Sequence, residues 1–424
     1  MSLHGFHDKL PVLLRIVTGM LLGEPHDALE ELAGMSLPRI NGTFAQGAFR
    51  VVKERFKRSL RNRMIQPTQQ ARHERLRCIL HPTFPLPYSL DILPELSLEE
   101  VLTSFHAEPT SSPRPSLWEG AFVEMLVHGN ETPESAKVLY DIAAKPVHAA
   151  ASCGSSTTCT PQTRTRAVQL PAGPPSVRRV VGSQPDQSNE VVELYWQWPD
   201  LSDSTESRVL LDLLETMLHE PIFDQLRTKQ QLGYTIASSA RRTGGVLGYL
   251  ITVQSDAFTP AHVTQRVEEF LQSWRDDLAA MPEAEIFQYV DSLCEQKARP
   301  DTALHETNDR WWEFVSEQEY DFCRIDEEIK ALSQLRAEDS AASLRSRLLA
   351  AFDALFGFGE YQNMARVLRT WITVKPGTVS RATRAGSSTI NGSEETHAGT
   401  EVTNPELWRL RHLAPPRAVT ASVT

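Results

Sequence analysis

The stretch from Leu226 to Ser255, LRTKQQLGYTIASSARRTGGVLGYLITVQS, constrains the fold of this chain more than any other part of it. Apolar side chains repeat at helical spacing from Leu211 to Leu226, which predicts an amphipathic helix. Gly233 interrupts that repeat. Residues 234–240 and 246–254 then have the composition of two strands joined by a glycine-containing turn. The stretch therefore predicts a helix, a break and a β-hairpin in direct succession.

Arg227 and Tyr234 are the two residues of this corner that offer chemistry. They lie seven residues apart, one at the helix end and one just beyond the break, so a guanidinium and a phenol could point at one carbonyl. Two such donors can act as an oxyanion site, each worth about 3–4 kcal/mol where water is excluded. The structural alternative places Arg227 in a surface ion pair and Tyr234 as an aromatic residue at a strand start. The residues alone favour this structural alternative.

Composition and charge describe a soluble globular protein. The 424 residues, 41% of them hydrophobic and 23% charged, are enough for two domains with separate cores. The net charge of −11 argues against nucleic acid as a main partner, because phosphate binding needs clustered Lys and Arg. The charge fits a chamber for cationic or neutral peptides, although solubility explains it equally well. No segment approaches the ~20 apolar residues that cross a bilayer, so no membrane partner is predicted.

The cysteine pattern favours a reducing, cytoplasmic compartment. The five cysteines are odd in number and scattered, without a C-x-x-C pair, so they indicate neither a disulfide framework nor a zinc ribbon. The opening run LPVLLRIVTGMLL contains Arg15 and follows no basic region, which predicts a buried helix rather than a secretory signal.

Changes in composition divide the chain into four predicted parts. Residues 1–145 have mainly helical patterns, with one buried strand expected at 121–127. Residues 146–189 are rich in Ser, Thr, Pro and Gly, which predicts a flexible linker. Residues 190–374 open and close with strands and carry helices between them, which predicts an α+β fold of antiparallel sheet packed with helices. Residues 375–424 predict a disordered tail.

The segment LRTKQQLGY, followed by a glycine-rich hairpin and an I-x-V-Q-S strand, resembles the C-terminal half of insulysin-type zinc metallopeptidases. These enzymes form the class with the inverted H-x-x-E-H motif. Upstream, HGFHDKLPVLLRIV, FRVVKERFKRSL and VEMLVHGN look like pieces of that family's third domain. The resemblance implies insulinase-type peptidase domains, one complete copy at 190–374 and one truncated copy at 1–145. The copy at 1–145 is expected to be truncated because its first helix begins almost at Met1, without the strands that precede this helix in the family.

The resemblance also implies that this chain has a partner. In such enzymes the Arg and Tyr of this corner reach across a closed chamber and assist chemistry at a zinc site on the other half. Arg227 and Tyr234 are then auxiliary catalytic residues, supported by Gln231, Gly233 and the strand 250–254. Zinc is expected only on a complementary N-terminal half. The expected partners are a peptide substrate and that half, or a homologous subunit.

No complete catalytic motif occurs in the sequence. A metallopeptidase needs a metal with an open coordination position and a general base beside it. None of the 13 histidines lies in an H-x-x-E-H or H-E-x-x-H motif, and the pairs that begin at His73, His219 and His305 lack a second histidine. G-x-S-x-G, P-loop and dinucleotide glycine patterns are absent as well. The isolated chain is therefore expected to hold no metal or cofactor and to be inactive.

Three hypotheses remain open. The first is the substrate-chamber half of an insulysin-like zinc metalloendopeptidase. The second is a non-catalytic peptidase-like scaffold that binds peptides or a partner without turnover. The third is a truncated product of limited stability, whose first domain leaves apolar surface uncovered.

Overall fold

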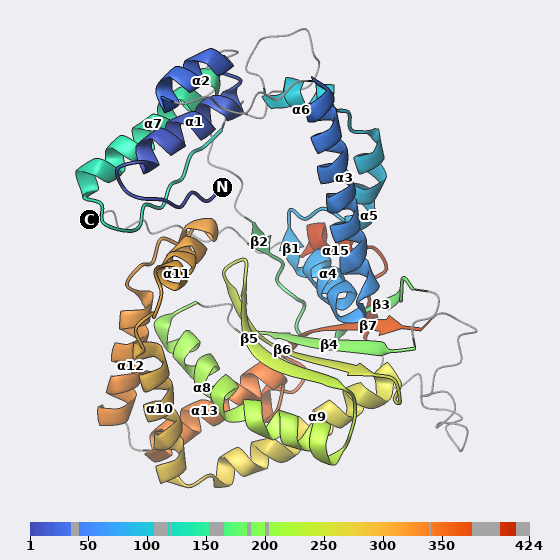
Figure 1. Cartoon of the computed structure of the whole chain (residues 1–424). Coiled ribbons are helices and arrows are strands. Elements are labelled where there is room, and N and C mark those ends of the chain that lie inside the picture. The colour runs from blue at the N-terminus through green and yellow to red at the C-terminus, as the bar shows by residue number, and fades with distance from the viewer. Residues whose placement is uncertain are drawn as a thin grey trace. The chain divides into compact units, whose positions relative to one another are not determined.

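A computed structural model describes residues 1–34, 42–105, 118, 121–151, 165–184, 188–199, 203–338, 341–374 and 399–412 (Figure 1). Contacts divide the chain into two compact units. Unit 1 comprises Met1–Leu60, Leu86–Arg164 and Asp301–Tyr320, and unit 2 comprises Arg61–Pro85, Thr165–Pro300 and Asp321–Thr424. Each unit is made of three separate segments of the chain. The division therefore differs from the contiguous domains 1–145 and 190–374 that were predicted.

Unit 1 is built from helices around a small core. Leu14, Leu139 and Ala143 are buried together there. The segment 121–127, predicted as a buried strand, is half-buried and pairs with no strand among the described residues. That prediction was wrong because apolar composition does not supply a pairing partner. The helices of unit 1 are α1 (Leu10–Leu22), α2 (His26–Ala33), α3 (Gly42–Ile65, which runs on into unit 2), α5 (Leu86–Ile92), α6 (Leu98–Phe105), α7 (Pro133–Ala151) and α11 (Leu304–Ser316).

Unit 2 is organised by a six-stranded mixed sheet in the order β5-β6-β4-β7-β3-β8. The strands are β3 (Ser176–Val181), β4 (Glu190–Gln197), β5 (Thr235–Thr243), β6 (Val246–Ser255), β7 (Arg366–Thr373) and β8 (Thr400–Glu401). The pairs β5–β6, β6–β4 and β4–β7 are antiparallel, whereas β3 is parallel to both β7 and β8. The predicted α+β class is confirmed, with a mixed rather than purely antiparallel sheet.

The two faces of this sheet have different cover. Helices of the C-terminal part lie against one face, where Val192, Leu194 and Trp196 of β4 enter the large core (Figure 1). These helices are α8 (Thr205–Ile222), α9 (Pro260–Ala280), α10 (Glu283–Ala298), α12 (Arg324–Glu338) and α13 (Ala341–Phe356). On the other face α4 (Pro67–Ile79) packs over β4 and β7, and its Arg75 reaches Glu193 at 2.9 Å. We call these the helix face and the open face.

Segments predicted to lack structure complete unit 2. Within the predicted linker, β2 (Arg166–Ala167) pairs with β1 (Leu80–His81), and β3 joins the main sheet. Within the predicted tail, β8 and the helix α15 (Pro405–Arg411) bury Val402 and Trp408 beside Cys78. The rest of both segments, 152–164, 185–187, 375–398 and 413–424, lies outside the described residues.

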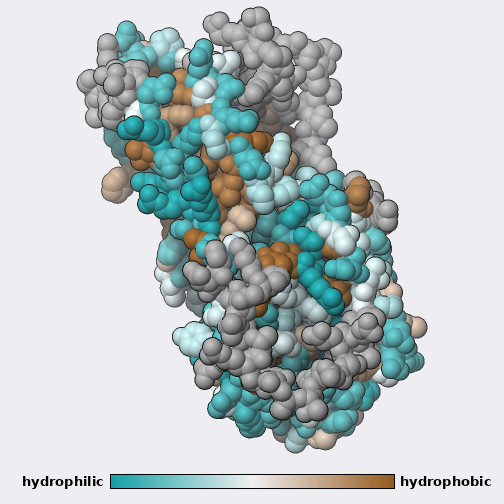
Figure 2. All heavy atoms as spheres, turned by 90° about the vertical axis from the view of Figure 1, so that its right-hand side faces the viewer, coloured by the Kyte–Doolittle hydropathy of each residue, from teal (hydrophilic) through white to brown (hydrophobic). Residues whose placement is uncertain are grey.

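The surface is polar around separate apolar patches (Figure 2). Exposed apolar side chains include Val52 and Phe56 of α3, which share helical spacing with Leu60. Only Leu60 is buried. Within the described residues, no helix is both long and apolar enough to span a bilayer.

Candidate functional site

The corner that carries Arg227 and Tyr234 begins with a change in helix type. Ser204 caps α8, its Oγ accepting the N–H of Ser207 at 3.1 Å. After Pro221, which has no N–H for the carbonyl four residues earlier, the chain continues as a π-helical segment, Phe223–Lys229. The N–H of Gln230 donates to the carbonyl of Gln225 at 2.9 Å, five residues back. Such π turns are rare and frequently mark functional sites.

Arg227 lies against two aromatic rings. Its guanidinium carbon is 5.1 Å from the ring centre of Phe223 and 5.3 Å from that of Tyr234. Both distances fall within the range of cation–π attraction. Tyr234 is 80% exposed and Phe223 is 45% exposed, so this pair of contacts faces solvent. The structure thus brings together the two residues that the sequence singled out and adds Phe223, which the sequence reasoning missed despite its four-residue spacing from Arg227.

The backbone beneath these side chains is tightly fixed. Leu226 and Leu232 are fully buried, and the N–H of Leu232 donates to the carbonyl of Leu226 at 2.9 Å. A Cβ on Gly233 would lie 2.1 Å from the carbonyl oxygen of Gln254, so only glycine fits there. The next residue, Tyr234, donates its N–H to that same oxygen at 3.1 Å. Exposed side chains on a buried backbone are suited to contacting a ligand.

The polar ends of Arg227 and Tyr234 have no partner among the described residues. No hydrogen bond or ion pair there involves the guanidinium or the phenol hydroxyl, and the nearby carboxylate of Asp224 is bound by Lys229 at 2.8 Å. Among the described residues, Arg227 therefore does not form the surface ion pair that the structural alternative predicts. Five N–H donors and one O–H donor remain available to a carbonyl or carboxylate.

The described residues do not supply a zinc site. They contain no group of three or more His, Cys, Asp or Glu side chains placed to hold a metal ion. Zinc in catalytic sites takes three protein ligands. His219, the histidine nearest the corner in sequence, is exposed on α8 beside the equally exposed Glu220.

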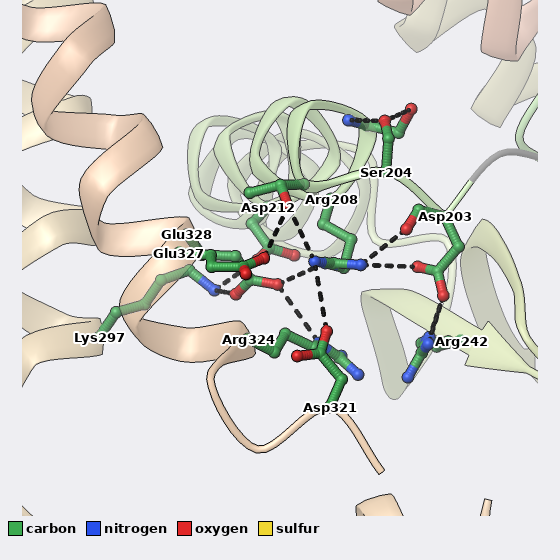
Figure 3. A network of polar contacts seen from close by, with 12 residues as sticks. Asp203, Ser204, Arg208, Asp212, Arg242, Lys297, Asp321, Arg324, Glu327 and Glu328 are labelled. Atoms are coloured by element: carbon green, nitrogen blue, oxygen red, sulfur yellow. Dashed lines mark hydrogen bonds and ion pairs between the residues drawn. The ribbon is translucent and has the colours of Figure 1, made fainter. Parts of the chain in front are cut away.

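A second polar cluster, on the helix face, is paired throughout (Figure 3). We call it the helix-face network. Arg208 lies at its centre and donates to Glu328 at 2.6 Å and to the carbonyl of Asp203 at 2.7 Å. Lys297 joins Asp212 at 2.6 Å and Glu328 at 2.8 Å, and Arg242 binds Asp203. The network links α8, α10, α12 and the hairpin, which is the role of a structural element rather than a ligand site.

The hairpin glycines are structural, as the sequence predicts. Gly244 and Gly245 have φ angles of +56° and +76°, which is the geometry of a two-residue turn between β5 and β6. They form no phosphate-binding loop.

Comparison with known proteins identifies relatives over most of the chain. A profile for the C-terminal lobe domain 4 of PqqF-like PQQ synthase matches residues 213–312. Nardilysin from Homo sapiens is 29% identical over 372 residues, 84% of this chain and 29% of that protein. Insulin-degrading enzyme from Homo sapiens is 28% identical over 349 residues, 80% of this chain and 30% of that protein. A nardilysin-like protein from Arabidopsis thaliana is 28% identical over 346 residues, again 80% of this chain and 30% of the relative.

The fold agrees with these similarities. The crystal structure of pitrilysin superimposes with a TM-score of 0.68 at 18% sequence identity, covering 96% of this chain and 37% of pitrilysin. This chain spans less than a third of the length of nardilysin, insulin-degrading enzyme and the nardilysin-like protein. The predicted resemblance to the C-terminal half of insulinase-type peptidases is confirmed.

Proposed function

We propose that this relative of the insulinase-type metallopeptidases is the substrate-chamber half of such an enzyme. It binds peptide and assists peptide-bond hydrolysis at a zinc site on a complementary N-terminal half or a homologous subunit, in the cytoplasm. The observation that carries the proposal is the exposed contact between Arg227 and Tyr234, whose donors have no partner among the described residues.

Each residue has a separate task in this proposal. The Tyr234 phenol donates a hydrogen bond to the oxyanion of the tetrahedral intermediate, and Arg227 binds a backbone carbonyl of the peptide. Stacking against Arg227 orients the Tyr234 ring, which is otherwise 80% exposed. The buried Leu226 and Leu232 hold the backbone, so little freedom is lost when substrate binds.

Reconstitution with an N-terminal half that carries H-x-x-E-H tests the proposal. The chain alone should cleave no peptide, and the mixture should hydrolyse a fluorogenic peptide in a chelator-sensitive way. Tyr234→Phe keeps the ring against Arg227 and removes only the hydroxyl, so kcat should fall by about 10²-fold, as when one oxyanion donor is lost. Chelator-sensitive hydrolysis by the chain alone, or no hydrolysis by the mixture, contradicts the proposal.

The second candidate is a peptidase-like scaffold that binds peptides or a partner subunit without turnover. The exposed Arg227 and Tyr234, with donors that have no partner among the described residues, are compatible with it as well, because such donors can bind a peptide without turnover. Tyr234→Phe separates the candidates: lost turnover with retained peptide binding supports the catalytic role, whereas unchanged turnover and binding support the scaffold.

A further inference from the structure

Three arginines converge on the open face of the unit 2 sheet. Arg72 and Arg75 lie three residues apart on α4, on the same side of that helix. Arg241 lies on β5, opposite Gly248 of β6, which in turn lies opposite Gln197 of β4. Side chains directly opposite one another in an antiparallel sheet share a face, so Arg241 shares a face with Gln197.

One buried carboxylate lies among these arginines. Glu193 accepts the Nε–H of Arg75 at 2.9 Å, and the guanidinium of Arg75 lies 5.5 Å from the ring centre of Tyr195. Both side chains of this ion pair are only 4% exposed. The Nη1 of Arg75 is buried without a hydrogen-bond partner, and Arg72 and Arg241, both exposed, have no ion pair among the described residues.

The cluster carries more positive than negative charge. Burial lowers the pKa of Arg241, and the charges of Arg75 and Arg72 lower it further, while Glu215 and Glu193 act in the opposite direction. Glu193 lies within this group of three guanidinium groups, whereas Glu215 belongs to α8 on the helix face, so positive charge predominates on the open face. This excess is local, because the whole chain carries a net charge of −11.

The sheet floor beside the cluster is accessible along β5, whereas Leu250 of β6 and Tyr195 of β4 are buried. In register with Glu193 lie Thr252 of β6 and Ala237 of β5, and in register with Tyr195 lie Leu250 and Ser239. Ala237 is exposed, while Ser239 and Thr252 are half-buried. Small side chains leave room for an extended chain above β5, with the arginines at one end.

We propose that Arg72, Arg75 and Arg241 form a binding site for a carboxylate group of an extended peptide lying on the open face of β5 and β6. Guanidinium groups bind carboxylates through paired, charge-assisted hydrogen bonds. A carboxylate group offsets the excess positive charge, whereas Glu193 would repel a dianion more strongly. The site deepens the proposed function, on which it rests for its ligand class: a peptide with an acidic side chain is preferred.

A matched pair of peptides measures this preference. Two labelled, end-blocked peptides of equal length differ only by one Asp in place of Asn, and fluorescence anisotropy gives the Kd of each for the full chain. The Asp peptide should bind about tenfold more tightly. Arg241→Gln should reduce that ratio to about one, and Arg72→Gln should reduce it severalfold.

Arg242→Gln is the matched control, because Arg242 is the next residue of the same strand and joins the helix-face network. It should keep the preference for Asp. Should Arg242→Gln fail to fold by circular dichroism, Arg336→Gln on α12, an exposed arginine paired with Asp291, replaces it.

Three results overturn the site: equal affinity for both peptides, no binding of either, or a preference that persists in Arg241→Gln. A fourth is that inorganic phosphate abolishes the preference when chloride of equal ionic strength does not, because the site would then belong to a small free anion. These measurements use the chain without an N-terminal half. Failure of the site and failure of the proposed function are therefore distinguishable.

Discussion

Arg241 and Arg242 are neighbours on β5 and point to opposite faces of one sheet. Arg242 enters the helix-face network, where its Nε donates to Asp203 at 3.0 Å and its charge is matched. Arg241 enters the cluster on the open face, where the charges of Arg75 and Arg72 add to burial in lowering its pKa. Alternation along a strand sends two identical side chains into opposite electrostatic settings.

The contrast between the two arginines separates charged groups that stabilise the fold from charged groups that are available to a ligand. In the helix-face network each buried group has a partner of opposite charge, and removing one member takes a contact away from another buried charge. In the open-face cluster like charges lie close together and two of the three arginines are exposed. Apart from the ion pair of Arg75 with Glu193, these charges repel one another in the folded chain, which favours a role in binding.

The largest effect is expected from Arg208→Gln, which removes the centre of the helix-face network. Glu328, which is 3% exposed, would lose its contact with Arg208 at 2.6 Å and keep Lys297. Both the carbonyl and the carboxylate of Asp203 would lose the same guanidinium. We expect the free energy of unfolding to fall by about 3–5 kcal/mol, measured by urea denaturation with circular dichroism. Arg72→Gln on the open face is the control and should change it by no more than about 0.5 kcal/mol. Equal losses in the two variants would remove the distinction between the clusters.

A direct comparison of Arg242→Gln with Arg241→Gln should show a smaller difference. Without Arg242 the side chain of Asp203, 10% exposed, loses its shortest ion pair and keeps its contact with Arg208 at 3.5 Å. A loss of about 1–3 kcal/mol is expected from this under-satisfied carboxylate. Arg241→Gln should cost nothing, since it relieves repulsion from Arg75 and Arg72. Both variants are compared in the same urea titration, and a larger loss in Arg241→Gln would contradict this reading of the two faces.

The elements around the corner could be predicted from local signals. Helical periodicity, the cap at Ser204, the break at Gly233 and the turn glycines all act over a few residues, and the structure has each of them. The contact between Arg227 and Tyr234 followed from the same signals together with the family resemblance. Local chemistry suffices where a helix, a break and a strand follow one another directly.

The rest of the fold and the open-face cluster depend on contacts between residues that are distant in sequence. Arg75 and Glu193 are 118 residues apart, so no local pattern links them. The strand β3 and the helix α15 lie in segments whose composition predicts a linker and a tail, and they are ordered through contacts with β7 and with Cys78. Alternation does place Arg241 and Arg242 on different faces. Which face the helices cover is decided by tertiary packing.

The two faces should also differ in the sign of their pH dependence. Burial opposes ionisation of Glu328, but the hydrogen bond and charge of Lys297, with Arg208 and Arg324, outweigh it and lower its pKa. Its contribution to stability is therefore present above its unfolded value of 4.5 and is lost as the pH falls through the folded pKa. Burial raises the pKa of Glu193 more than Arg75 lowers it, so its contribution is present below 4.5 and is lost as the pH rises through the folded pKa.

Glu328→Gln and Glu193→Gln test these opposite signs in urea titrations on both sides of pH 4.5. As the pH falls, the stability advantage of the unaltered chain over Glu328→Gln should shrink. Its stability relative to Glu193→Gln should rise over the same interval. Parallel slopes in the two variants would show that the two carboxylates share one environment.

The smallest effect is expected at the corner, where Arg227 meets neither carboxylates nor other arginines but two neutral rings. Phe223→Leu removes one ring and should cost no more than about 0.5–1 kcal/mol, because an exposed cation–π contact is weak. Phe287→Leu is the control, since Arg336 lies 4.4 Å from the Phe287 ring centre on helices away from the corner. Only Phe223→Leu should lower kcat/KM of the reconstituted peptidase, by severalfold, because it loosens Arg227. Equal activity in the two variants would mean that stacking by Phe223 orients nothing that the substrate contacts.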